Sequence, residues 1–388
     1  MWHGGGPRLR PWTFLFSLVF ATLLVFGDSA LAQRRGGAGS VPNKPQLGAI
    51  GEALNANTIA IVSGNPNATY MTIAYDLSAV LDDGDEFRIL PVIGKGGGQN
   101  IKDVRFLKGI DLGITQSNLL PYFKRTNEIG VIDDKIVYIA KLFNEEMHLI
   151  VRADSGIKSL ADLHGRKVNF SDLGSGTQLS TRDIFEKLGI HPEEVNMGQA
   201  DAFEALKRGQ IAATILIAGK PAGAMAKLKA QDGFRILPVA FDKPLQTDYL
   251  PTTLTSEDYP GLIAPGERVE TVAVSAVLIA FNWPKGSDRY RRTQAFVDHF
   301  FPRLAEFQKP PRHPKWREAN LAAVLPGWKR FEGAEEWLRN RDKVADTERQ
   351  QFGAFLAQRV SNNVSLTSEE RDRLFQEFLT WSKARERR

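Results

Sequence analysis

The sequence predicts an α/β fold of two lobes that is followed by a helical extension. Apolar runs of strand length alternate with runs that repeat at helical spacing, as in parallel βαβ units, and this alternation begins near residue 57 and restarts near residue 148. Beyond Lys309 the composition shifts to Trp, Arg and Glu. We therefore assign the first part of lobe 1 to residues 57–147, lobe 2 to 148–240, a return segment that completes lobe 1 to 241–308, and the extension to 309–388.

The N-terminus has the pattern of an export signal. Two arginines precede an apolar run over residues 12–26, and Ala30-Leu31-Ala32 fits the small-residue rule for signal-peptide cleavage. The apolar run is too short to favour a helix that spans a bilayer. We therefore predict a cleaved signal peptide over residues 1–32 and a mature chain that begins at Gln33; the alternative is an uncleaved anchor. Residues 33–56, rich in Gly, Pro, Ala and Asn, are expected to form a flexible leader.

The composition excludes several classes of function. The chain has 50 basic and 45 acidic residues, and because these charges are interspersed, no basic stripe indicates a nucleic-acid partner. The absence of cysteine excludes disulfides, thiolate metal sites and cysteine nucleophiles. The six histidines never stand at metal-ligand spacing, and no nucleotide-binding or serine-hydrolase fingerprint is complete. We therefore expect no cofactor, no metal and no catalytic residue.

In lobe 1 the pattern predicts three strands with two helices between them. The strands are expected at 58–62, 87–93 and 111–115, which are β-branched or apolar runs. Apolar residues recur at helical spacing over 70–80 and again over 101–107. Lobe 1 should therefore begin with consecutive βαβ units.

In lobe 2 the same pattern returns. The predicted strands are 148–151, 167–170 and 213–217, and the predicted helices are 177–188, 200–207 and 222–229. A long apolar run and an amphipathic helix follow at 271–280 and 290–304. In the extension, Thr367 and Glu370 have the spacing of a capping box at the start of another helix.

Five short loops rich in Gly, Ser, Asn and Thr each follow a predicted strand, at 63–65, 96–100, 116–118, 174–177 and 219–221. The carboxyl ends of parallel strands are where ligands bind in α/β folds. Free backbone N–H groups at the helix starts attract anions there. The sequence therefore predicts a site for a small anion, with these candidate ligand-binding residues: Ser63, Gly64, Tyr70, Gly98, Gln99, Asn100, Gln116, Ser117, Ser175, Gly176, Thr177, Gly219 and Lys220.

Several of these candidates also have an ordinary structural explanation. The Ser175 and Thr177 hydroxyls are suited to a ligand carboxylate and equally to capping a helix. Tyr70 can face the ligand or pack in the core. Lys95 and Lys220 are the cations inside these loops, and each can pair with an anion or stay solvated.

Three segments resemble the TAXI-type solute receptors of TRAP transporters. They are LADLHGRKVNFSDLGSGTQ at 160–178, GGGQNIKDVRFLKGIDLGITQSN at 96–118 and EALKRGQIAATILIAGKP at 204–221. The first is similar to the family's GSGT signature, and the other two to its Gln-Ser-Asp and Gly-x-Ile-Asp-Ala stretches. Asn118 and Ala212 stand where the family has Asp, and the tail exceeds the family's usual length.

The resemblance implies a type II periplasmic-binding-protein fold with two α/β lobes, a hinge and a central cleft. It also implies a small organic acid or amino acid as ligand and a permease driven by an ion gradient as partner. We therefore predict a monomeric periplasmic solute-binding protein, not an enzyme, which closes around a small anionic solute and delivers it to a TRAP-type permease. The alternatives are a ligand-sensing module for a membrane signalling partner and the substrate-binding protein of an ATP-driven importer.

Overall fold

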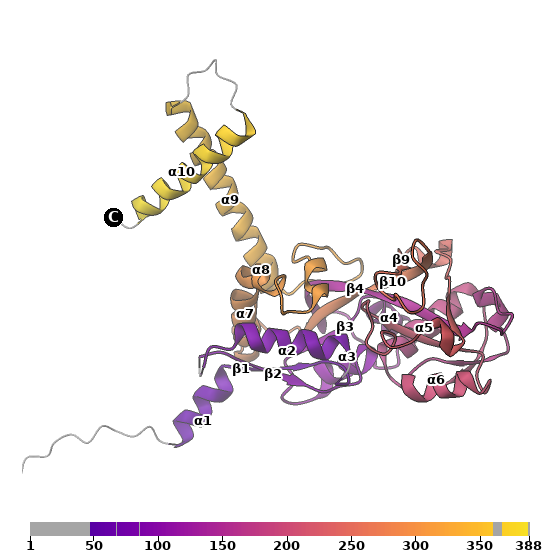
Figure 1. The fold of residues 1–388 in the computed structure, drawn as a ribbon. Helices are drawn as coiled ribbons and strands as arrows, with labels where there is room; N and C mark the ends of the chain where they lie inside the picture. Colours follow the sequence, from indigo (N-terminus) through magenta and orange to yellow (C-terminus); the bar gives the residue numbers. More distant parts are fainter. Residues whose placement is uncertain (1–46, 67, 85, 360–366, 387–388) are drawn as a thin grey trace, which may run out of the picture. The chain divides into compact units, whose positions relative to one another are not determined.

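The computed structural model describes residues 47–66, 68–84, 86–359 and 367–386. The predicted signal peptide and its cleavage site lie outside these residues. Ten strands form one mixed sheet with helices on its faces, so the predicted α/β class is confirmed (Figure 1). The strands are β1 Thr58–Val62, β2 Arg88–Val92, β3 Leu112–Gln116, β4 Ile136–Arg152, β5 Lys167–Asn169, β6 Glu193–Val195, β7 Ala213–Ala218, β8 Phe234–Leu237, β9 Leu250–Thr255 and β10 Arg268–Phe281.

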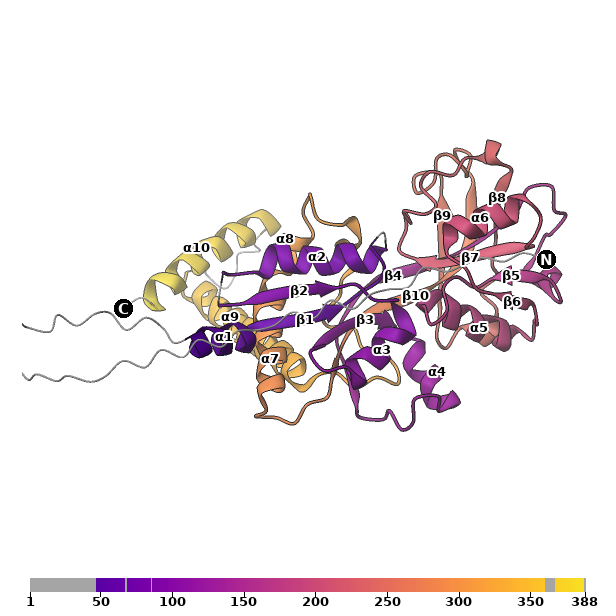
Figure 2. The same cartoon turned by 90° about the horizontal axis from the view of Figure 1, so that it is seen from below.

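The sheet consists of two similar halves joined by two long strands. Its order is β2-β1-β3-β10-β4-β7-β5-β6, with β8 paired to β4 and β9 to β10. Strands β1, β2 and β3 are parallel, as are β5, β6 and β7, whereas β4 and β10 run antiparallel to each other. Figure 2 shows β4 and β10 passing from one group of strands to the other. Two lobes of similar plan, as predicted, therefore share these strands.

The crossing point can be located from the pairing register. Glu146 of β4 pairs with Ala273 of β10 and also with Ala218 of β7. Before Glu146, β4 pairs with β10 in lobe 1; after it, β4 pairs with β7 and β8 in lobe 2. Residues 249–272, in the predicted return segment, pack in the lobe 2 core clusters and are counted with lobe 2. We call the part of β4 around Glu145 and Glu146 the crossing point. Any hinge motion between the lobes has to bend β4 here and β10 beside it.

Helices cover both faces of each half of the sheet. Along β10, Ala276, Leu278 and Ala280 enter one core cluster while Val277 and Ile279 enter another. Because both faces are buried there, residues 276–281 of this strand are apolar at successive positions rather than at alternate ones. The α-helices are α1 Leu47–Ala56, α2 Thr69–Leu81, α3 Gly97–Phe106, α4 Leu119–Thr126, α5 Gly176–Leu188, α6 Gln199–Lys207, α7 Asp288–Phe300, α8 Leu304–Phe307, α9 Glu332–Arg359 and α10 Ser368–Glu386.

Two predicted segments differ in the structure. Residues 47–56, placed in the flexible leader, form helix α1, because Leu47, Ile50 and Leu54 stand at helical spacing. Residues 222–229 form successive turns instead of the predicted helix. There Gly223 weakens the helix and the N–H of Ala222 donates to the Tyr259 hydroxyl at 2.8 Å.

The chain that follows α8 packs against lobe 1. We call residues 309–331 the C-terminal strap; it contains the short 3₁₀ helix Pro314–Glu318. Its Trp316 is fully buried in the lobe 1 core, and the indole Nε1–H donates to the Asp76 carboxylate at 2.9 Å. Farther along, the N–H of Phe331 donates to the carbonyl of Tyr138 in β4 at 2.8 Å. The strap therefore belongs to the packed core of lobe 1.

Helices α9 and α10 follow the strap. The Phe352 ring of α9 contacts the Phe375 and Phe378 rings of α10 at 5.0 and 5.5 Å between centroids. The predicted capping box is present, since the N–H of Thr367 donates to the Glu370 carboxylate and the N–H of Glu370 donates to the Thr367 hydroxyl. None of the described helices is long and apolar enough to cross a membrane.

Candidate functional site

Two of the predicted glycine-rich loops, one from each lobe, meet directly. A Cβ added to Gly97 would lie only 2.1 Å from the Cα of Gly176. The N–H of Gln99 donates to the carbonyl of Gly174 at 3.2 Å. A Cβ on Gly98 would lie 2.2 Å from the Leu179 side chain. The lobes are therefore in contact at these loops, and the arrangement is a closed one.

The contact brings the N-termini of α3 and α5 together. Gly97 and Gly98 begin α3, Gly176 and Thr177 begin α5, and all four residues are buried. In the described part of the chain, none of their four backbone N–H groups has a hydrogen-bond partner. The first N–H groups of a helix carry partial positive charge and no intrahelical bond. Four such groups at one interface provide donors for an anion.

The hydroxyls of the 174–177 loop are already engaged within lobe 2. The Ser175 Oγ accepts the N–H of Gln178 at 3.1 Å, which is a helix cap. The Thr177 hydroxyl donates to the carbonyl of Ile217 at 3.2 Å and accepts its N–H at 3.0 Å. The backbone amides of this loop, and not its hydroxyls, are therefore the groups left to contact a ligand.

The 116–118 loop of lobe 1 also reaches lobe 2. The Ser180 hydroxyl of α5 donates to the Gln116 Oε1 at 2.6 Å. The Asn118 Nδ2 donates to Ser180 at 3.0 Å and to the Tyr249 hydroxyl at 2.8 Å. The backbone of Ser117 donates to Ser275 and accepts from the Trp328 Nε1–H of the strap at 2.7 Å. Gln116 and Asn118 thus join the lobes, while Ser117 fastens the loop to its own lobe.

Other candidates act inside lobe 1. The Asn100 Nδ2 donates to the carbonyls of Ser63 and Ile114, each at 2.7 Å, and so ties the ends of β1 and β3 together. The Ser63 hydroxyl donates to the carbonyl of Val92 at 2.8 Å. Gly64 packs against Ala68, where a Cβ would be 2.9 Å away. These residues support the conformation of the loops through contacts within lobe 1.

Tyr70 contacts a buried carboxyl group that the sequence did not reveal. Its hydroxyl donates to Glu145 Oε2 at 2.6 Å. Glu145 lies at the crossing point and is only 4% exposed. Burial raises its pKa to about 8, although hydrogen bonds from Tyr70 and Gln116 act in the opposite direction. Two adjacent acidic residues inside the apolar run of β4 were the available sequence signal.

Gly219 and Lys220 attach lobe 2 to the crossing point. The backbone N–H of Lys220 donates to the Glu146 carboxylate at 2.8 Å. The Lys220 ammonium donates to Asp258 at 3.0 Å, so it is paired within lobe 2. Glu146 also forms an ion pair with Lys315 of the strap at 2.7 Å, and a Cβ on Gly219 would lie 3.2 Å from that lysine. Lys315 was outside the predicted site because it is far away in the sequence.

We expect the free energy of unfolding to fall as the pH rises from about 6.5 to 8. Glutamate titrates near pH 4.3 and histidine near 6.5 in unfolded chains. Folded Glu145 keeps its proton up to about pH 8, whereas buried His148 has a pKa lowered to about 4 by desolvation. The two contributions oppose each other below pH 6.5. Above pH 6.5, of these two groups only Glu145 contributes, and it lowers the free energy of unfolding by up to about 1.4 kcal/mol per pH unit.

Urea denaturation of the wild-type protein and of Glu145→Gln at pH 6.5 and pH 8 measures this effect. In the variant, the free energy of unfolding should no longer show the part of its fall between pH 6.5 and pH 8 that Glu145 causes. An equal change with pH in both proteins would contradict the assignment.

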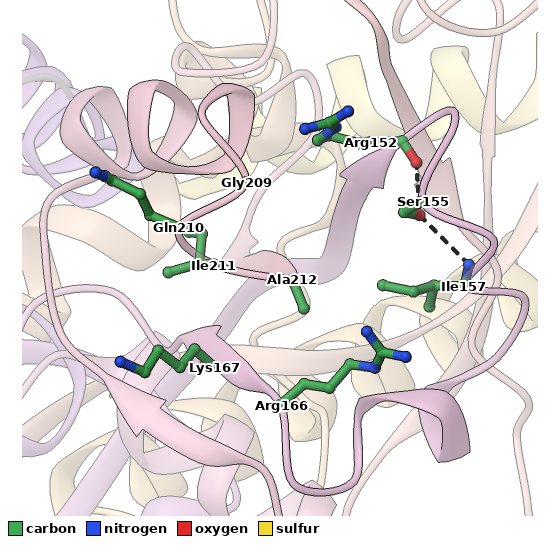
Figure 3. Close-up of a pocket in the computed structure, with 9 residues that line it drawn as sticks. All are labelled: Arg152, Ser155, Ile157, Arg166, Lys167, Gly209, Gln210, Ile211 and Ala212. Atoms are coloured by element: carbon green, nitrogen blue, oxygen red, sulfur yellow. Dashed lines mark hydrogen bonds between the residues drawn. The ribbon is translucent and has the colours of Figure 1, made fainter.

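The structure has a separate surface depression on lobe 2. It has a volume of about 380 Å³ and lies beside the starts of β5 and β7, the opposite strand ends from the loops described above (Figure 3). Of its three cations, Arg152 is bound to Asp154 at 2.6 Å and Lys167 to Glu193 at 3.6 Å, leaving Arg166. Two of the three charges are therefore already balanced. Among the described residues, no cluster of three His, Cys, Asp or Glu could hold a metal ion.

Comparisons with known proteins find one matching family and several solved structures of low sequence identity. A family model described as the NMT1-like family matches residues 61–339. One similar solved structure is an amino acid ABC transporter substrate-binding protein, AbpA from Streptococcus pneumoniae, bound to L-arginine; identity is 14%, coverage 66% of this chain and 92% of that one, and the TM-score 0.40. Another is a putative periplasmic sulfonate-binding protein, SsuA from Methylobacillus flagellatus, with 16% identity, 68% and 72% coverage, and a TM-score of 0.40.

Proposed function

Because the chain belongs to the NMT1-like family, we propose that it is an extracytoplasmic solute-binding protein. It captures a small anionic organic solute, a carboxylate or an amino acid, by closing its two lobes. The observation that carries this proposal is the meeting of the α3 and α5 N-termini, where four buried N–H groups have no partner in the described part of the chain. A hydrogen bond to a charged group contributes about 1.5–3 kcal/mol, so a carboxylate that reaches donors of both lobes favours the closed form.

The contacts between the lobes suit reversible closure. They include polar contacts, such as the Ser180–Gln116 hydrogen bond at 2.6 Å and the ion pair of Arg125 with Asp183 at 2.7 Å. Polar groups exchange these partners for water on opening, so each contact contributes only about 0.5–1.5 kcal/mol net. The lobes can therefore separate to admit a solute, with β4 and β10 as the two connections that bend.

The remaining parts of the proposal concern location and delivery. The export pattern of residues 1–32 favours a periplasmic mature chain that begins at Gln33. The similarity of three segments to TAXI-type receptors favours a TRAP-type permease as the membrane partner. Among the described residues, the site offers backbone amides and paired side chains and no activated nucleophile, which favours binding and release without a chemical step.

A thermal-unfolding screen of the mature protein tests the proposal. The screen uses amino acids, dicarboxylates and 2-oxo acids. A bound solute at a hundred times its dissociation constant should add about 2.7 kcal/mol to the free energy of unfolding. Small-angle scattering should show a smaller radius of gyration when that solute is added. If no compound in these classes stabilises or compacts the protein, the proposed function is wrong.

A further inference from the structure

The crossing point holds more buried acid than base. Glu145 and Glu146 are 4% and 2% exposed. Lys315, which is 3% exposed, binds both Glu146 at 2.7 Å and Glu318 at 2.8 Å. In the described part of the chain, Glu145 forms no ion pair. One buried cation is therefore shared by two other carboxylates, and Glu145 lacks a counter-ion.

The groups around Glu145 do not supply that counter-ion. Tyr70 from α2 donates its hydroxyl at 2.6 Å, and Gln116 from β3 donates a side-chain hydrogen bond; both are neutral. The charged neighbours are Glu146 on β4 and Lys315 on the strap, and Lys315 is already committed to the other two acids. Because a buried carboxylate without a cation is costly, Glu145 keeps its proton; a cation brought by a ligand stabilises the ionised carboxylate, and the proton is released to solvent.

Glu145 lies beside the positive helix ends. Gln116 bonds to Glu145, and its Oε1 is 2.7 Å from the position that a Cβ on Gly176 would take. Gln116 therefore stands between an acidic group on one side and the start of α5 on the other. A solute that lies against Gln116 and contacts both sides needs a cationic group and an anionic group a few bonds apart.

We propose that Glu145 binds a protonated amine of the solute while the N–H groups of the α3 and α5 N-termini bind its carboxylate. The inference rests on the proposed function and narrows the solute class from carboxylates in general to amino acids. Glu145 is then the residue that distinguishes an amino acid from the hydroxy or oxo acid of the same carbon skeleton. The Tyr70 hydroxyl and the Gln116 amide position its carboxylate.

Isothermal titration with matched pairs of L-amino acids and their 2-oxo acids tests this inference. In the wild-type protein, the amino acid of the best pair should bind at least tenfold more tightly than its oxo acid. Glu145→Gln keeps the size of the side chain but cannot take on the negative charge that pairs with a bound amine. It should weaken amino-acid binding at least tenfold and oxo-acid binding less than threefold.

The matched control is Glu318→Gln, which removes a charge from the same cluster at a side chain that is 37% exposed and bonded to Lys315. This variant should keep the wild-type ratio between amino acid and oxo acid. If Glu145→Gln does not fold, Tyr70→Phe, which removes one bond to Glu145, should reduce the same ratio.

Two results would overturn the inference. One is an oxo acid that binds the wild-type protein as tightly as its amino acid. The other is a Glu145→Gln variant that weakens both members of a pair equally. In either case a solute still binds and the proposed function stands. If no member of any pair binds or compacts the wild-type protein, the proposed function itself fails.

Discussion

The Gly97→Ala variant is expected to bind its solute at least a hundredfold more weakly than the wild-type protein and still to fold. Its new Cβ would lie 2.1 Å from the Cα and 2.3 Å from the N of Gly176. These are backbone atoms, so no side chain can move aside. The clash exists only when the lobes meet, and its cost therefore falls on closure. A penalty of about 2.7 kcal/mol corresponds to this hundredfold loss.

The matched control for this variant is Gly84→Ala. Gly84 is also in lobe 1 and has a positive φ of +54°, against +41° at Gly97, but a Cβ there meets nothing within 4 Å. Both variants lose about 1–2 kcal/mol of stability through backbone strain, whereas only Gly97→Ala should lose affinity and compaction in titration and small-angle scattering. Wild-type affinity in Gly97→Ala would show that the solute-bound form does not contain this contact.

Lys315→Met is expected to lower the free energy of unfolding by about 3–5 kcal/mol, measured by urea denaturation. The substitution leaves Glu146 buried without its cation, and breaking one partner out of a buried ion pair typically has a cost of this size. It also detaches the strap from the crossing point, where Glu146 holds the N–H of Lys220 at 2.8 Å. Replacing both partners, as Lys315→Met with Glu146→Gln, should recover part of the loss because the uncompensated charge is gone.

Lys285 provides a matched control for Lys315, because it is also a lysine paired with two glutamates. It also binds two glutamates, Glu332 at 3.3 Å and Glu336 at 2.8 Å, but its side chain is 58% exposed whereas that of Lys315 is 3% exposed. Exposed pairs contribute about 0–1 kcal/mol, so Lys285→Met should change stability by no more than that. Equal losses in the two variants would mean that burial does not make the Lys315 pair stronger.

The sequence predicted those strands whose residues are uniformly apolar or β-branched. The strand predicted at 58–62 is β1, and the run at 271–280 is most of β10. The first half of β4 was missed because Lys141, Asn144 and the two acids of the crossing point interrupt its apolar pattern. The two acids are buried there because other segments supply partners: Tyr70 of lobe 1 for Glu145, and Lys315 of the strap for Glu146. Polar residues inside this buried strand therefore prevented its prediction from the apolar pattern.

The candidate site was predictable only where it is built from the backbone. Glycines that follow strands mark helix starts, and the structure brings two of these loops together. The side chains between them come from distant segments: Tyr70 and Glu145 are 75 residues apart, and Glu146 and Lys315 are 169 apart. Local spacing carries no information on such pairs. Local spacing also does not show that the Thr177 hydroxyl is hydrogen-bonded to the backbone of Ile217, because that contact depends on how α5 packs on β7.

The antiparallel pairing of β4 with β10 makes lobe 2 an insertion in lobe 1. The chain leaves lobe 1 after Glu146 and returns at Ala273, and these two residues are paired neighbours. The intervening segment contains all of β5, β6 and β7 in one continuous stretch. Because the two ends of this segment are adjacent, a different inserted domain with the same distance between its ends could be attached at the same two points of lobe 1. The lobe 2 part of the proposed site can therefore be exchanged as one block during evolution, while lobe 1 keeps its own order of strands.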